Sequence, residues 1–150
     1  MPLAERARAV NDRWPAVSHW LTAAETEYLR SGWERALAAA PWPGPAHWVH
    51  GDVHPRNLLQ VDGRLVGMID FGDVGAGDPA VDFAVAWLAF DPGQRERFWS
   101  IVRSEGSYDD AIRTRANGWA VVLCTAMIAD PVTRRNLWPM LEDIRTQLQP

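Results

Sequence analysis

The chain has 150 residues, a formal net charge of −4, and a composition that is 47% hydrophobic and 23% charged. These totals are typical of one soluble globular domain. The basic residues are scattered and no apolar run approaches the roughly 20 residues of a membrane span, so we expect neither a nucleic-acid nor a membrane partner. "MPLAERARAV" has charges where a signal peptide needs an apolar stretch, and Cys124 is the single cysteine, which together predict a cytoplasmic location.

Helices account for most of the predicted elements. Apolar residues at helical spacing, with start and stop signals, predict helices at residues 3–13, 22–40, 80–90, 92–104, 108–129 and 132–148. The first should end before Pro15, because the residue that precedes a proline avoids helical backbone angles. The second should begin at a capping box, for which Thr22 and Glu25 have the right spacing. Prolines at 41, 43 and 45 then make a stiff connector to a short extended segment.

A small β-hairpin interrupts the helices in the middle of the chain. Two apolar runs at residues 57–61 and 64–69 flank Asp62-Gly63, which is the strongest short-range hairpin signal. Residues 71–79, "FGDVGAGDP", are predicted to be a glycine-rich loop. The predicted order is therefore helices, one hairpin, and further helices.

Polar side chains gather at the open end of this predicted hairpin. Asp52 and Asn57 precede its first strand in the stretch "HGDVHPRN", and Asp70 and Asp73 follow its second strand. Because antiparallel pairing returns the chain to its starting point, Asn57 and Asp70 should meet, with Asp52 on the adjoining loop. A few oxygen ligands that leave coordination positions open suit a Mg²⁺ ion that also binds a phosphate.

The order and spacing of these residues match a known pattern. The kinase template is H-R-D, an asparagine after four further residues, and then D-F-G. Here His50-Gly51-Asp52 is followed by Asn57 in register and by Asp70-Phe71-Gly72. With glycine in the middle of the first motif, and with "GMIDFGDVGAGDPAVDFA" after it, the segment 46–90 resembles the aminoglycoside phosphotransferase family, which includes choline-kinase-like small-molecule kinases.

The resemblance implies a role for the three central residues. Asp52 would be the catalytic base that accepts the proton of, or orients, the substrate hydroxyl. Asn57 and Asp70 would hold Mg²⁺ against the phosphates of the nucleotide. Each residue taken alone is an ordinary loop residue, and only their joint spacing points to this chemistry.

Five further residues receive supporting or open roles from the resemblance. His50 would brace the loop, Asp78 would cap the following helix, and Asp82 would hydrogen-bond back to the catalytic loop. For His54 and Asp73, contact with the substrate or the metal stays open, and simple solvent exposure is the alternative for Asp73.

The expected fold is α+β and mainly α: a single domain, residues 1–150, that forms the C-terminal lobe of a protein-kinase-like fold with a catalytic β-hairpin between helices. The expected function is Mg²⁺-dependent transfer of the γ-phosphoryl group of ATP or GTP to a hydroxyl group of a small molecule. We expect the nucleotide-binding N-lobe to be absent, because the sequence contains no lysine and no glycine-rich strand turn before residue 50.

Two alternatives stay open at this point. The chain could be a non-catalytic or split-enzyme remnant that binds a ligand, or that pairs with a separate N-lobe chain or a second copy of itself through an exposed apolar hinge face around Pro41 to Trp48. A minor alternative is a metallohydrolase with transition-metal ligands at His50, Asp52, His54 and Asp70. Gly51 and Pro55 oppose the helix that a zincin-type pair of histidines needs.

The sequence does not decide the acceptor molecule. In the family that the chain resembles, the acceptor lies among the C-terminal helices, where acidic side chains favour cationic amino sugars. The acidic candidates are Asp109, Asp110, Glu142 and Asp143, and the apolar candidates are Trp119, Trp138 and Met140. This mixture is compatible with an antibiotic, a sugar, choline or a homoserine-like alcohol.

Overall fold

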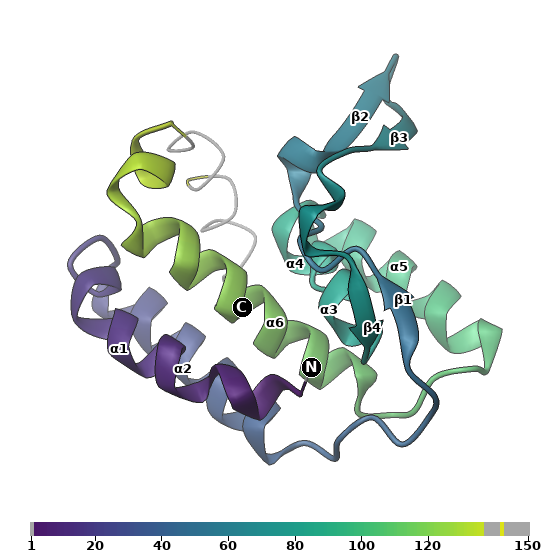
Figure 1. The fold of residues 1–150 in the computed structure, drawn as a ribbon, viewed down its shortest axis with the longest axis horizontal. Helices are drawn as coiled ribbons and strands as arrows, with labels where there is room; N and C mark the ends of the chain where they lie inside the picture. The colour runs from purple at the N-terminus through teal and green to yellow at the C-terminus, as the bar shows by residue number, and fades with distance from the viewer. Residues whose placement is uncertain (1, 137–141, 143–150) are drawn as a thin grey trace.

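The N-terminal helices pack on one long central helix. The structure is a computed structural model that describes residues 2–136 and 142. A 3-10 helix, η1 (Leu3–Arg6), leads into α1 (Ala7–Val17), and α2 (Ala23–Ala38) follows. Both pack against α6 (Ile112–Ala129), which crosses the middle of the molecule (Figure 1).

The start of α2 is confirmed, whereas the predicted end of the first helix is wrong. Thr22 and Glu25 form the predicted capping box. The helix α1 continues through Pro15 to Val17. Pro15 lies in the last turn, where only one backbone hydrogen bond is lost, and the buried side chains of Trp14 and Val17 hold this turn against the core.

The hydrophobic core lies between α1, α2, α6 and the short helices after the strands. α6 alone buries twelve residues, among them Cys124. The buried apolar residues of α1 and α2 that face it are Val10, Trp14, Val17, Leu29, Trp33 and Ala36. No helix among the described residues is long and apolar enough to cross a membrane.

Two small antiparallel sheets lie beside α6. The first pairs β1 (His47–Val49) with β4 (Gly75–Gly77), so part of the segment predicted to be a loop is a strand. The glycine-rich sequence carries no apolar alternation, and pairing with β1 supplies the order that its side chains do not. Residues 71–74, which include the 3-10 helix η3 (Phe71–Asp73), and residues 78 and 79 keep the predicted loop character.

The predicted hairpin is present. β2 (Leu58–Val61) pairs with β3 (Arg64–Met68), and Asp62 and Gly63 connect them with φ angles of 50° and 72°. Positive φ at both positions is typical of a type I′ turn. In Figure 1 the hairpin projects away from the helices.

The helices after the strands differ from the prediction in their boundaries. The expected helix 80–90 is divided into α3 (Ala80–Phe83) and α4 (Val85–Leu88), because the N–H groups of Ala84 and Trp87 bond three residues back, as in a 3-10 turn. α5 (Pro92–Glu105) begins at an Asp91–Gln94 capping box, close to the prediction.

The long helix α6 begins at Ile112 and not at residue 108. Residues 109–111 form a turn in which Ile112 N–H donates to the carbonyl of Asp109. The Asp109 carboxylate accepts hydrogen bonds from Arg115. After α6, residues 131–136 are helical, and Thr133 N–H donates to Asp130 as its start signal predicted. The rest of the expected helix 132–148 lies outside the described residues, apart from position 142.

Candidate active site

The loop after β1 is held by the backbone contacts of Gly51 and the carboxylate of Asp82. Asp82 Oδ2 and Oδ1 accept hydrogen bonds from the N–H groups of His50 and Gly51, each at 2.8 Å, so the predicted contact of Asp82 with this loop is present. Gly51 has φ of 86°, and a Cβ atom there would lie 2.6 Å from the carbonyl oxygen of Asp73. Only glycine fits this combination of backbone angle and close approach.

His50 connects the loop to the end of the hairpin. Its Nε2–H donates to the carbonyl of Ile69 at 2.8 Å, and its Nδ1 accepts from Asp52 N–H at 3.3 Å. Its ring also lies 4.7 Å, centroid to centroid, from the ring of Phe71. The side chain is buried, and these contacts are those of a residue that fixes the loop.

Asp52 is surrounded by hydrogen-bond donors. His54 Nε2 lies 3.4 Å from Asp52 Oδ2, and Asn57 Nδ2 donates to the same oxygen at 3.3 Å and to the Asp52 carbonyl at 2.9 Å. The hydrogen bond from His54 is the main reason why the pKa of Asp52 is lowered, and it outweighs the opposing effect of burial. Asp52 therefore stays ionised at neutral pH and can accept a proton or a hydroxyl hydrogen bond.

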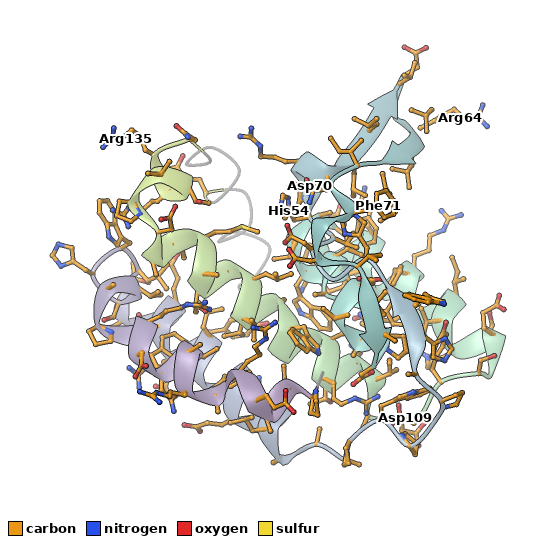
Figure 2. The ribbon with its side chains drawn as sticks, in the orientation of Figure 1. His54, Arg64, Asp70, Phe71, Asp109 and Arg135 are labelled. Carbon is orange, nitrogen blue, oxygen red and sulfur yellow. The ribbon has the colours of Figure 1, made fainter. Side chains whose placement is uncertain are left out.

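Asn57 and Asp70 lie at the same end of the hairpin, as the sequence predicted. Leu58 pairs with Met68, and Ile69 N–H donates to the carbonyl of Asn57 at 3.0 Å. In Figure 2, Asp70, Phe71 and His54 all lie at the base of the hairpin. Asp70 has φ of 63° and ψ of 63°, a left-handed conformation that is uncommon outside glycine and is concentrated at functional sites.

The chemistry of Asn57 and Asp70 fits Mg²⁺. The Nδ2 group of Asn57 is committed to Asp52, which leaves the amide oxygen as the atom that it can offer to a cation. The Asp70 carboxylate accepts no hydrogen bond from the described part of the chain and is solvent-exposed. Two hard oxygen ligands with open positions around them are what a phosphate-bound Mg²⁺ ion requires.

The remaining predicted residues lie in two places. Asp73 is on η3 and lines a cavity of about 320 Å³ together with Asp52. Asp78 accepts a hydrogen bond from the N–H of Ala80, as expected of a capping residue, but its main partner is Arg115 at 2.6 Å.

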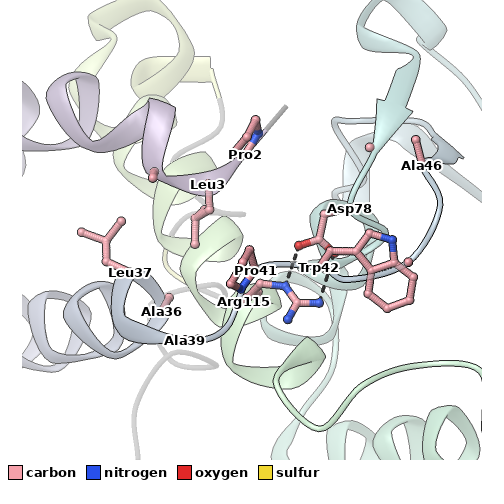
Figure 3. A pocket seen from close by; sticks show the side chains of 13 residues that line it. Pro2, Leu3, Ala36, Leu37, Ala39, Pro41, Trp42, Ala46, Asp78 and Arg115 are labelled. Carbon is pink, nitrogen blue, oxygen red and sulfur yellow. Dashed lines mark hydrogen bonds and ion pairs between the residues drawn. The ribbon is translucent and has the colours of Figure 1, made fainter.

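Arg115 is the structural residue that sequence reasoning missed. Its side chain is buried and forms ion pairs with Asp78 (Figure 3) and with Asp109, and it donates to the carbonyl of Ala40. The hydrogen bond from Arg115 lowers the pKa of Asp109. Arg115 and Asp78 are 37 positions apart, and no local sequence pattern indicates that they pair. The sequence therefore held no signal that could have identified Arg115.

This network corrects the list of acceptor candidates. Asp109 is neutralised by Arg115, and Figure 2 shows it at the far end of the molecule from Asp70, so it does not form a cation-binding wall at this site. Asp110 and Glu142 are exposed, whereas Trp119 is buried and lines the cavity beside Asp52. Three candidates lie outside the described residues: Trp138, Met140 and Asp143.

The metallohydrolase alternative finds no support in these contacts. Both ring nitrogens of His50 are engaged with backbone groups. Nδ1 of His54 accepts from Arg56 N–H, and Nε2 faces Asp52. In the described ranges 2–136 and 142, no three His, Cys, Asp or Glu side chains are grouped to hold a metal ion.

The two hinge tryptophans have different environments. Trp48 on β1 is 83% exposed. Trp42 is half-buried and donates its indole N–H to the Pro45 carbonyl. The Cζ atom of Arg115 lies 5.8 Å from the centre of the Trp42 ring. Trp42 therefore belongs to the Arg115 network, and Trp48 belongs to an exposed apolar surface.

Parts of this chain are similar in sequence to small-molecule phosphotransferases. An aminoglycoside 3'-phosphotransferase of Escherichia coli is 42% identical over 71 residues, which cover 43% of this chain and 25% of that protein. A homoserine kinase of Granulibacter bethesdensis is 38% identical over 64 residues, or 43% of this chain and 20% of that protein.

Solved structures show the same fold. The macrolide 2'-phosphotransferase MphH of Brachybacterium faecium has a TM-score of 0.50 at 21% identity, and a type I macrolide 2'-phosphotransferase has the same TM-score at 19% identity. Each match covers 100% of this chain and 50% of the other, so the chain spans about half the length of these enzymes. The model of the phosphotransferase enzyme family matches residues 1–119, and the chain belongs to that family.

Proposed function

We propose that this chain supplies the catalytic and metal-binding part of a kinase that transfers the γ-phosphoryl group of ATP or GTP to a hydroxyl group of a small molecule. The observation that carries the proposal is the ionised Asp52, held by His54 and by Asn57, with Asn57 tied through the hairpin to Asp70. The phosphotransferase relatives support the reaction class.

The transfer step follows from the position of Asp52. The substrate hydroxyl donates a hydrogen bond to the carboxylate, and its oxygen attacks the γ-phosphorus as the bond to the bridging oxygen of the nucleotide breaks. A new phosphorus–oxygen bond forms on the acceptor, the nucleoside diphosphate leaves, and Asp52 takes the hydroxyl proton. His54 keeps the carboxylate oriented and ionised for this purpose.

Asn57 and Asp70 would hold the Mg²⁺ ion, which neutralises charge on the nucleotide phosphates when it is bound. Asp70 follows β3 in a left-handed backbone conformation. The hydrogen bond from Ile69 N–H to the Asn57 carbonyl holds the backbone segments of the two ligands together. His50 and Asp82 hold the loop that carries Asp52 in a fixed position relative to the end of the hairpin.

The nucleotide also needs a clamp, which we propose comes from an N-terminal lobe. The hairpin, β1 and η3 expose large apolar side chains in succession: Trp48, Leu59, Val61, Leu65, Val66, Ile69, Phe71 and Val74. We call this group the hairpin face. Large apolar side chains exposed together on neighbouring elements are typical of an interaction site, and a lobe that covers them would enclose the nucleotide next to Asp70.

Calorimetry of the purified chain with Mg²⁺-ATP and Mg²⁺-GTP tests the proposal. Binding should require Mg²⁺ and be lost in Asp70→Asn. A matched control is Asp62→Asn, which removes the same charge from the exposed hairpin turn, where asparagine tolerates the positive φ. Asp52→Asn should bind nucleotide and abolish transfer. Equal binding by Asp70→Asn and Asp62→Asn would contradict the assignment of the metal site.

A further inference from the structure

The cavity beside Asp52 has two walls of opposite charge. Its volume of about 320 Å³ is at the lower end of the roughly 300–1,000 Å³ of small-molecule sites. Asp52 and Asp73 line one side, together with Asp78, which is paired with Arg115, and Arg6 and Arg13 line the side that η1 and α1 form. Apolar residues of α6, with Trp119 among them, complete the lining. Figure 1 shows how α1, α6 and β4, which contribute to it, are arranged.

The two arginines form a pair without an acidic partner in the part of the chain that the structure describes. They are seven residues apart, about two helical turns, and therefore lie on the same face of η1 and α1. The Nε group of Arg6 is buried and has no hydrogen-bond partner among the described residues, and its guanidinium lies 5.9 Å from the centre of the Trp119 ring. Arg13 donates one N–H to the carbonyl of Val122 at 3.4 Å.

The environment of Arg13 reflects this lack of compensation. Its pKa is lowered, first by burial and then by the positive charge of Arg6. Across residues 2–136 and 142, no carboxylate forms an ion pair with either guanidinium. Buried charges are normally paired, and both arginines are half-buried, so an anion in this cavity would supply the partner that the described residues do not.

The contrast with Arg115 shows what a structural arginine looks like in this fold. Arg115 lines a larger cavity of about 430 Å³ together with its ion-pair partner Asp78 (Figure 3), and it is neutralised further by Asp109, which lies outside that lining. That cavity does not include Asp52. The uncompensated pair, in contrast, lines the cavity that also contains the proposed base.

We propose that the acceptor is a small alcohol that carries an anionic group, carboxylate or phosphate, which Arg6 and Arg13 bind while its hydroxyl group reaches Asp52. Guanidinium groups bind both anions through paired N–H donors. The inference rests on the proposed function, because it is the role of Asp52 as the base that places the reacting hydroxyl group at that end of the cavity. It also distinguishes this site from one built for polycationic amino sugars, which two arginines would repel.

A series of three-carbon alcohols tests the charge requirement by ligand-observed NMR and calorimetry on the full chain. The series is D-glycerate, glycerol 3-phosphate, glycerol, and the cationic 2-aminopropane-1,3-diol. We expect the two anions to bind about tenfold or more tightly than glycerol, with the cation weakest and with anion binding reduced at high ionic strength. Comparison of glycerate with glycerol 3-phosphate shows which anionic group the site prefers. Equal binding of all four compounds would overturn the inference.

Variants locate the binding to the arginines. The double substitution Arg6→Met and Arg13→Met should reduce anion binding about tenfold or more. The matched control Arg8→Met removes an exposed arginine of α1 that lies away from the cavity and should bind as the unmodified chain does. An equal loss in the control would overturn the inference, as would a double variant that loses Mg²⁺-ATP binding and keeps anion binding.

A parallel titration with Mg²⁺-ATP separates this inference from the proposed function. Nucleotide binding that depends on Asp70, together with no preference for anionic alcohols, would overturn the inference alone. Anion binding without any Asp70-dependent nucleotide binding would overturn the proposed function, and the acceptor role with it. Both preferences in one chain would support both.

Discussion

At the scale of single residues, the contact between His54 and Asp52 controls the protonation of the proposed base. His54 Nδ1 accepts from Arg56 N–H, so Nε2 carries the proton that faces Asp52. We predict that His54→Phe raises the pKa of Asp52 toward its ordinary value of about 3.9, since the largest lowering contribution is removed. A ¹³C NMR titration of the Asp52 carboxyl group measures this shift.

The sign of the effect on stability follows from the same contact. Because the pKa of Asp52 is lower in the folded state, its stabilising contribution is present above the unfolded pKa and is lost as the pH falls through the folded one. The acid-induced decrease in the free energy of unfolding should therefore be smaller in His54→Phe. His54→Gln keeps an N–H donor and should stay closer to the unmodified chain. Identical titrations of both variants would contradict this account.

Arg115 gives a second prediction at this scale. Arg115→Met should lower the free energy of unfolding by about 3 kcal/mol, because it leaves two partly buried carboxylates, Asp78 and Asp109, without their cation. On the same helix, Arg113 pairs with Glu96 at the surface, and Arg113→Met should change stability by less than about 1 kcal/mol. Urea unfolding measures both values, and equal losses would contradict the importance of burial.

Sequence reasoning found residues whose spacing along the chain is itself the signal. Asp52, Asn57 and Asp70 belong to one segment, and a hairpin brings them together whatever the rest of the fold does. The roles of Arg115 and Arg13, in contrast, depend on contacts with elements that are far away in sequence. Their partners, Asp78 and Val122, lie 37 and 109 positions away, and no local pattern predicts such pairings.

At the scale of elements, Gly51 and Gly63 both have positive φ, but only Gly51 is also closely packed. Comparing them separates the cost of a left-handed backbone from the cost of a steric clash. At Gly63 a Cβ atom would meet nothing within 4 Å, so Gly63→Ala should cost only the left-handed backbone, about 1 kcal/mol. At Gly51 the same change also places a Cβ atom 2.6 Å from the Asp73 carbonyl oxygen.

We predict that Gly51→Ala destabilises the chain by more than Gly63→Ala does and also weakens Mg²⁺-ATP binding. The clash would push η3 away from the loop that carries Asp52, whereas the turn at Gly63 lies at the distal end of the hairpin. Thermal unfolding and calorimetry of both variants test this, and unchanged nucleotide binding in Gly51→Ala would contradict it.

Element prediction succeeded where a local signal determines the structure. The capping box at Thr22 and the Asp62-Gly63 turn both act through neighbouring residues, and both are present. It failed where tertiary packing decides. Pro15 stays helical because Trp14 and Val17 are buried around it, and Gly75–Gly77 becomes a strand because β1 lies alongside.

At the scale of the whole molecule, the hairpin face is an exposed apolar region among the described residues. Leu65 and Val66 are each 60% exposed on a strand that projects from the helices (Figure 1). Exposed strand edges with apolar side chains pair with other surfaces unless they are covered. In the proposed kinase an N-terminal lobe covers this face, so the purified chain should use it for contact with itself.

We predict concentration-dependent self-association of the purified chain, measured by sedimentation velocity. The double substitution Leu65→Ser and Val66→Ser should raise the dissociation constant about tenfold, since each side chain loses part of an apolar contact. The control Ile101→Ser removes a side chain of α5 with a similar exposure of 55% and should leave association unchanged. A monomeric chain at all concentrations, or an equal effect of Ile101→Ser, would contradict the hairpin face as a docking surface. A lobe fused to the chain that abolishes self-association and strengthens Mg²⁺-ATP binding would identify the natural occupant of that face.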